Sequence, residues 1–263
     1  MNSRTKVALP LNFRNLPLVE AAVRASLESP VKLTFRILNA ILERLRDEFP
    51  DQSELPQLYV PPGIRDSSIE LSPHQIPGAV FRGNKDGLSI AVQSQVLVAH
   101  WAKRAGPDAP KYPRYRALRD SLWRAVDCLR EVCEQPPPRI IVVNMSYVNF
   151  IQSSQGPAVL RRYFSGRARL AAADEARKVH KLEASWQEPD GIDLRLCFEH
   201  VTAKVETESI EGYRFTTACG QHVSEGKSDR DALDEVHERL QGFFADIISD
   251  DAKTDWGLER SDA

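Results

Sequence analysis

Hydrophobic and polar positions alternate near the N-terminus. From Pro17 onward, apolar residues recur at every second position between Val19 and Leu27. A period of two predicts a half-buried strand. Ser29 and Pro30 then offer a cap and a first helical residue, so we expect a helix to begin there. Its apolar residues recur at helical spacing, and they are Leu38, Ile41, Leu42, Leu45 and Phe49.

Prolines then interrupt the pattern. Residues 50–78 contain six of them, which rules out a regular helix and predicts a looped or extended segment. Strand-like alternation resumes at Gly78 and continues to Val98, with a polar turn at 84–87, so an antiparallel meander is expected. A second amphipathic helix begins at Pro113 and ends before residues 136–138, which are three consecutive prolines.

The second half of the chain repeats this order of elements. It predicts a strand at 139–150, a short helix near 158–164, and strands near 179–187, 193–205 and 213–223. A closing helix follows, capped by Ser228, with its apolar residues on one face. The fold class is therefore α+β, with two similar halves of strand, helix, antiparallel meander and helix, and with the helices packed on one face of antiparallel sheet. We expect an N-terminal half at 1–135, a C-terminal half at 139–250 and a tail at 251–263.

The composition is that of an ordinary soluble globular protein. The 263 residues are 42% hydrophobic and 27% charged. Apolar runs are short, far below the roughly 18 residues of a spanning helix, so no contact with a membrane is expected. Residues 1–10 lack the apolar stretch of a secretory signal, and the four cysteines form no Cys-x-x-Cys pair. These features favour the reducing cytoplasm.

Charge is distributed unevenly along the chain. The net charge is +1 over residues 1–100, +9 over 101–181 and -12 over 182–263, for a total of -2. The basic and acidic segments can neutralise each other within one subunit or across a dimer, the basic segment can bind phosphates, or the acidic end can dock a basic partner. Because the segments can pair between subunits and sheet edges need covering, we expect a two-fold homodimer.

Aromatic residues stand among the basic ones in the middle segment, a pattern that suits single-stranded nucleic acid. The candidate nucleic-acid-binding residues are Arg161, Arg162, Tyr163, Arg167, Arg169, Arg177, Lys178 and Lys181. The alternative is that Tyr115 and Phe164 pack into the core while the arginines face solvent.

Two Cys-x-x-His pairs are candidate zinc ligands, since thiolate and imidazole are the ligands of tetrahedral zinc. They are Cys197 with His200 and Cys219 with His222. The first pair is expected inside a strand, where a separation of three places two side chains on opposite faces. That spacing argues against a shared ion.

No catalytic signature stands out. The sequence contains no Gly-x-Ser-x-Gly, phosphate loop, dinucleotide fingerprint or His-Glu-x-x-His. We therefore assign no catalytic residue and expect no cofactor. Cys128 and Cys133 are expected on a helix as buried small residues.

Several short phrases resemble one protein family. They are Phe13 to Glu20 (FRNLPLVE), His100-Trp101, Tyr112 to Tyr115 (YPRY), Tyr147-Val148-Asn149 (YVN) and Asp251 to Gly257 (DAKTDWG). This order resembles a sporadically distributed, uncharacterised family of prokaryotic proteins of about 250 residues. The chain departs from the family pattern at Leu16, where Pro is expected, and at His100, where Asn is usual before Trp.

The resemblance implies one architecture over nearly the whole chain, without an added effector domain and without established catalytic residues. Patchy distribution implies an accessory gene, in a mobile-element, phage-defence or toxin–antitoxin locus. From these features together we expect a non-catalytic binding or adaptor protein that acts through a protein partner. The alternative is a nucleic-acid-binding protein, or a metal-dependent nuclease assembled from scattered residues that uses the basic middle segment.

Overall fold

The computed structural model describes residues 12–54, 78–83, 87–103, 111–133, 136–152, 158–165, 181–205 and 208–259. The chain divides into two compact units. The first comprises residues 1–21, 145–221 and 231–263, and the second comprises 22–144 and 222–230. Among the described helices, none combines the length and apolar character that crossing a bilayer requires.

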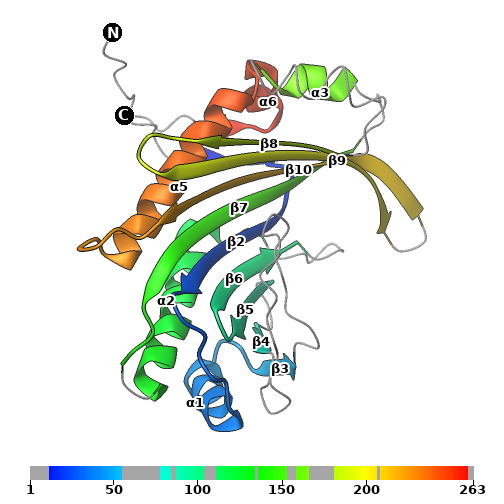
Figure 1. The fold of residues 1–263 in the computed structure, drawn as a ribbon. Helices are drawn as coiled ribbons and strands as arrows, with labels where there is room; N and C mark the ends of the chain where they lie inside the picture. Colours follow the sequence, from blue (N-terminus) through cyan, green and yellow to red (C-terminus); the bar gives the residue numbers. More distant parts are fainter. Residues whose placement is uncertain are drawn as a thin grey trace. The chain divides into compact units, whose positions relative to one another are not determined.

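The main sheet has nine strands in the order β3-β4-β5-β6-β2-β7-β10-β9-β8 (Figure 1). Its strands are β2 (Leu18–Leu27), β3 (Asp51–Glu54), β4 (Gly78–Arg82), β5 (Leu88–Gln93), β6 (Val96–Ala102), β7 (Ile140–Gln152), β8 (Lys181–Gln187), β9 (Ile192–Val205) and β10 (Glu208–His222). The sheet is antiparallel and helices pack against it. The predicted α+β class is therefore confirmed.

In the second unit, side-chain alternation determines which face of the sheet is covered. Along β2 the buried residues after Leu18 are Ala21, Val23, Ala25 and Leu27, in agreement with the predicted period of two. Helices α1 (Phe35–Leu45) and α2 (Arg114–Val132) pack on the sheet, with α2 against β5 and β6 (Figure 1). Their buried stripes contribute mostly aliphatic side chains, including Ile41, Leu118, Leu122 and Leu129.

Helix α1 begins later than the sequence predicts. Thr34 is its N-cap, because the Thr34 hydroxyl accepts a hydrogen bond from the Ile37 amide at 3.3 Å. The expected cap at Ser29 and Pro30 is wrong, since the amide of Val31 donates instead to the carbonyl of Ser94 at 2.7 Å. A tertiary hydrogen bond has thus overridden a local capping signal.

The first unit is built around aromatic side chains. This unit contains the strands β8, β9 and β10 together with three helices, α3 (Ala158–Tyr163), α5 (Asp229–Ile247) and α6 (Asp250–Asp255). A separate short strand pair joins β1 (Asn12–Phe13) to β11 (Leu258–Glu259). The buried rings are Phe13, Phe164, Phe198, Tyr213, Phe215, Phe244 and Trp256. Several meet edge to face, such as Phe164 with Phe215 at 4.9 Å between ring centroids. Contacts between aromatic rings therefore stabilise the core of this unit.

The two units interleave along the sequence. The predicted boundary near residues 136–138 falls inside the second unit, ahead of β7. The predicted tail at 251–263 contains most of α6 and all of β11. The similarity of the two halves remains a prediction.

Candidate functional site

The structure describes four of the eight candidate nucleic-acid-binding residues. Arg161, Arg162 and Tyr163 form the last turn of α3, and Lys181 begins β8. Lys181 forms an ion pair with Glu183 at 3.3 Å. The other four candidates, Arg167, Arg169, Arg177 and Lys178, lie outside the described residues.

Two of these side chains are bound by one carboxylate of α6. The Arg162 guanidinium donates to Asp255 at 2.7 Å, and the Tyr163 hydroxyl donates to the same carboxylate oxygen at 3.0 Å. The guanidinium also lies 5.4 Å from the centroid of the Tyr163 ring. Burial raises the pKa of Tyr163, and its hydrogen bond to Asp255 raises it further. Arg162 and Tyr163 therefore connect α3 to α6, and these contacts compete with any binding of phosphate by the two side chains.

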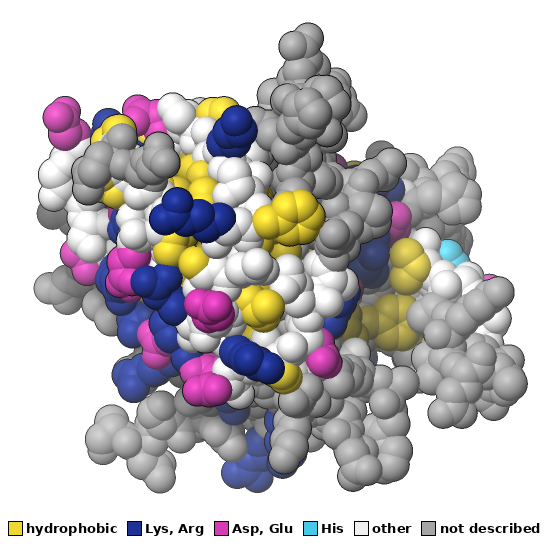
Figure 2. Space-filling view, turned by 90° about the horizontal axis from the view of Figure 1, so that it is seen from below, with side chains coloured by type: hydrophobic (Ala, Val, Ile, Leu, Met, Phe, Trp, Pro, Cys, Tyr) yellow, Lys and Arg dark blue, Asp and Glu magenta, His cyan; other side chains and the backbone are white. Residues whose placement is uncertain are grey.

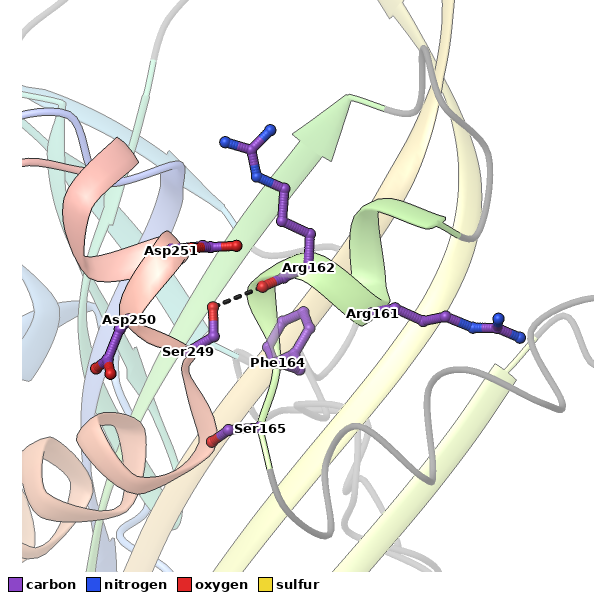
Figure 3. A pocket seen from close by; sticks show the side chains of 7 residues that line it. All are labelled: Arg161, Arg162, Phe164, Ser165, Ser249, Asp250 and Asp251. Carbon is purple, nitrogen blue, oxygen red and sulfur yellow. Dashed lines mark hydrogen bonds between the residues drawn. The ribbon is translucent and has the colours of Figure 1, made fainter.

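A cleft of about 470 Å³ lies at this junction of α3 and α6 (Figure 3). Arg161 and Arg162 line it from α3, and Asp250 and Asp251 line it from α6. In Figure 3 the two arginine side chains diverge, and the Asp251 carboxylate is directed toward the α3 side. The remaining lining residues are Phe164, Ser165 and Ser249.

Hydrogen bonds to the backbone fix the floor of this cleft. The Ser249 hydroxyl donates to the Arg162 carbonyl at 2.6 Å and accepts from the Ala252 amide at 3.1 Å (Figure 3). The Ser165 hydroxyl donates to the Asp246 carbonyl at 2.9 Å. Ser249 therefore holds α6 against α3, whereas Ser165 binds the C-terminal end of α5, and both hydroxyl protons are already used.

The walls of the cleft carry both signs of charge. Guanidinium groups stand on the α3 side and carboxylates on the α6 side. Asp250 is 98% exposed and pairs with Lys253 at 3.2 Å, so its carboxylate still faces water. Phe164, by contrast, is 1% exposed and belongs to the aromatic core below. The result is a fixed polar cleft on an apolar base, which suits a ligand that carries both acidic and basic groups.

The candidate zinc ligands are not brought together. Cys197 pairs with Thr216 across β9 and β10, whereas His200 pairs with Tyr213, so the two side chains leave the sheet on opposite faces. Cys219 is buried, and burial raises its thiol pKa to about 12. His222 is exposed at the end of β10. Within the part of the chain that the structure describes, no three His, Cys, Asp or Glu side chains form a metal-binding group.

The helical cysteines behave as structural residues. Cys128 is buried on α2, and Cys133 follows the helix in a half-buried position. Burial raises the pKa of both thiols, so they are protonated at neutral pH.

Sequence reasoning missed Asp255 and Phe35. Asp255 lies 93 residues after Arg162, and nothing local links the two. A usable signal was present only in the DAKTDWG phrase, which contains Asp255. Phe35 is 68% exposed. The sequence signal for this exposure was that Phe35 lies to one side of the apolar stripe of α1, which consists of Leu38, Ile41 and Leu45.

Comparisons with known proteins leave the family open. No family model matches the chain, and no curated protein matches it. A solved structure described as KH domains is similar at 10% sequence identity, with a TM-score of 0.19. That match covers 93% of this chain and 66% of the other. A TM-score this low carries no argument about fold or function.

Proposed function

We propose that this is a non-catalytic binding protein that acts through a protein partner, and that the α3–α6 cleft contacts that partner. The observation that carries the proposal is that Arg161 of α3 and Asp251 of α6 line one cleft, whose floor is held by hydrogen bonds to the backbone. Protein surfaces offer acidic and basic side chains within a few residues of one another. Charges of both signs around one cleft favour such a surface and set its orientation.

The same charges disfavour a nucleic acid at this position. A polyanion approaching Arg161 also meets the carboxylates of Asp250 and Asp251. Arg162 is engaged by Asp255, so its capacity to neutralise phosphate is reduced. Like-charge repulsion at close range opposes binding, which favours a partner of mixed charge.

The hydroxyl groups support binding rather than catalysis. A nucleophilic serine gives its proton to an adjacent base. Ser249 and Ser165 donate to backbone carbonyls instead, which accept a hydrogen bond but cannot take the proton. Burial raises the pKa of the cysteine thiols, which disfavours the reactive thiolate form. The residues are Cys128, Cys133, Cys197 and Cys219.

The proposal extends to the internal architecture. Outward from the middle of the sheet, the strand order is β2, β6, β5, β4, β3 on one side and β7, β10, β9, β8 on the other, so β3 is an additional edge strand without a counterpart. In each series the first strand lies innermost with the last strand of the meander beside it, and a helix, α1 or α3, follows the first strand. This shared order of elements supports two similar halves that descend from one duplicated unit.

Three further expectations belong to the same proposal. We place the protein in the cytoplasm and in the family that its phrases resemble, within an accessory locus such as a phage-defence or toxin–antitoxin locus. We also expect self-association as a two-fold dimer, driven by the segregated charge of the chain. Light scattering at low and high salt tests the dimer, and a monomer under both conditions contradicts it.

The experiment for the cleft begins with the tagged full chain expressed in its native cells. Proteins that co-purify are identified by mass spectrometry, and the purified partner is titrated by calorimetry against Arg161→Glu and Asp251→Lys. We expect each substitution to raise the Kd about tenfold or more, because a charged contact made in the complex is reversed.

Glu225→Lys is the matched control, since Glu225 is exposed in the turn after β10 and does not line the cleft. Its Kd is expected to equal that of the wild type. The proposal is overturned if both cleft variants bind like the control. It is equally overturned if nothing but nucleic acid co-purifies.

A further inference from the structure

Helix α1 carries an aromatic side chain at the surface of the second unit. Phe35 is 68% exposed, and among the described residues no other large hydrophobic side chain is exposed to this degree. The space-filling view in Figure 2 shows hydrophobic side chains reaching the surface between basic and acidic ones. A phenylalanine held in water forgoes about 1.5–3 kcal/mol of burial free energy, so its position calls for a physical reason.

The geometry of α1 explains why Phe35 does not reach the core. Thr34 caps the helix, so Phe35 is its first helical residue. The buried stripe consists of Leu38, Ile41 and Leu45, and at 3.6 residues per turn Phe35 lies about 90° away from the middle of that stripe. Leu42, seven residues later, lies on the same side as Phe35 and is half-buried.

Two cations flank the exposed ring in the sequence. Lys32 and Arg36 are both exposed, and within the described part of the chain neither forms an ion pair. The first turn of α1 contains no acidic residue. The positive end of the helix dipole adds to these charges, because the first turn supplies no carboxylate to compensate it. We call Lys32, Phe35 and Arg36 the α1 surface.

We propose that the α1 surface docks an acidic segment of a protein partner, with an apolar side chain of the segment on Phe35 and its carboxylates at Lys32 and Arg36. Charge complementarity selects this occupant, because the surface combines one apolar anchor with two cations that form no ion pair with any residue the structure describes. The inference rests on the proposed function in that the partner is a protein. It concerns a different surface from the α3–α6 cleft.

The remainder of α1 argues for a short acidic segment over a long polyanion. Glu43 and Asp47 are exposed toward the C-terminal end of the helix, and Glu48 pairs with Arg124. A nucleic acid carries a charge at every nucleotide and would run from Arg36 into these carboxylates. A peptide can confine its acidic residues to the N-terminal turn of α1.

The test uses a library of random twelve-residue peptides selected in parallel against the full-length wild type and Phe35→Ser. We expect peptides enriched on the wild type alone to carry net negative charge and at least one aromatic or aliphatic residue. For such a peptide, Phe35→Ser and Arg36→Glu are each expected to weaken binding about tenfold or more, and added salt is expected to weaken it further. Phe35→Leu retains an apolar anchor and is expected to restore most of the affinity.

Two matched controls separate this proposal from the others. Arg46→Glu changes an exposed arginine at the opposite end of α1, and it is expected to leave peptide affinity unchanged. The cleft variants Arg161→Glu and Asp251→Lys are also expected to bind the peptides normally, so failure of the cleft and failure of the α1 surface give different results. Thermal unfolding of Phe35→Ser should match that of the wild type, which verifies that the variant is folded.

Four outcomes overturn the proposal. The first is selected peptides that bind Phe35→Ser as well as the wild type, and the second is selected peptides without net negative charge. The third is binding of a twenty-nucleotide oligo-dT that is lost in Phe35→Ser, which assigns the surface to nucleic acid. The fourth is self-association that is lost in Phe35→Ser, which assigns the surface to a second copy of the chain.

Discussion

Helices α1 and α3 each place an arginine beside an aromatic residue, and they use the pair differently. On α3, Arg162 and Tyr163 both bond to Asp255, and the backbone carbonyl of Arg162 accepts from Ser249. On α1, Phe35 and Arg36 are exposed, and within the described residues neither contacts a carboxylate of its own unit. The same residue types therefore stabilise the fold in one unit and form an open surface in the other.

The difference shows that a basic and aromatic motif does not define a binding site by itself. What decides its role is whether the fold supplies a carboxylate at the right place. At α3 that carboxylate comes from α6, and an aromatic core supports the junction. At α1 the acidic side chains lie further along the helix.

The largest expected effect is a loss of stability on removing Trp256, an aromatic core residue that contacts α3. Trp256 is 5% exposed and packs against Phe13, Tyr163, Phe215 and Phe244. Trp256→Ala is expected to lower the free energy of unfolding by about 3–5 kcal/mol, because it removes a large buried ring and leaves a cavity. Urea unfolding followed by circular dichroism measures it.

The matched change in the other unit is Phe35→Ala, for which we expect a difference within about 0.5 kcal/mol of the wild type. If Trp256→Ala and Phe35→Ala lowered the free energy of unfolding equally, the basic and aromatic residues of α1 would be as important to the fold as those of α3. A large loss for Phe35→Ala alone would mean that α1, and not α3, uses these residues for stability.

Much of the fold follows from local sequence. Alternation from Val19 to Leu27 predicts β2, and the apolar face after Ser228 predicts α5. The period of two also places Cys197 and His200 on opposite faces, as the structure does. These features depend only on residues close together in the chain, which is why pattern reasoning finds them.

The parts that sequence reasoning missed depend on distant residues. Val31 bonds to Ser94 and displaces the start of α1 to Thr34. Arg162 meets Asp255 because α6 folds back on α3, and the assignment of residues 251–263 to a tail hid this contact. No local pattern specifies which of many acids in the last third pairs with a given arginine.

An intermediate effect is expected from removing the carboxylate itself. Asp255→Asn weakens two hydrogen bonds, and because Arg162 and Asp255 are partly exposed we expect a loss of only about 1 kcal/mol. The comparison is Arg36→Gln on α1, which breaks no ion pair among the described residues and should leave the free energy of unfolding unchanged. If Arg36→Gln costs as much as Asp255→Asn, then α1 also holds its arginine internally.

The smallest effect is a pH dependence. Burial and Asp255 raise the pKa of Tyr163 above its ordinary value of 10.0, so the unfolded chain loses this proton at lower pH than the folded one. The stabilisation is complete below pH 10 and declines as the pH rises past the unfolded value. Tyr163→Phe is therefore expected to lose less stability than the wild type between pH 10 and 11 in urea unfolding. An identical pH profile for the two proteins would show that folding does not raise the pKa of Tyr163.

The most direct measurement of the central claim is photo-cross-linking in living cells, with a benzoylphenylalanine placed at position 250, which lines the cleft and is exposed, or at position 225 outside it. Both substitutions leave Arg161 and Asp251 in place. Mass spectrometry of the adducts identifies what lies against each position. The account predicts one protein adduct, formed at position 250 and absent at position 225. Adducts that form equally at both positions, or an adduct at position 250 that contains nucleic acid, would contradict binding of a protein partner by the α3–α6 cleft.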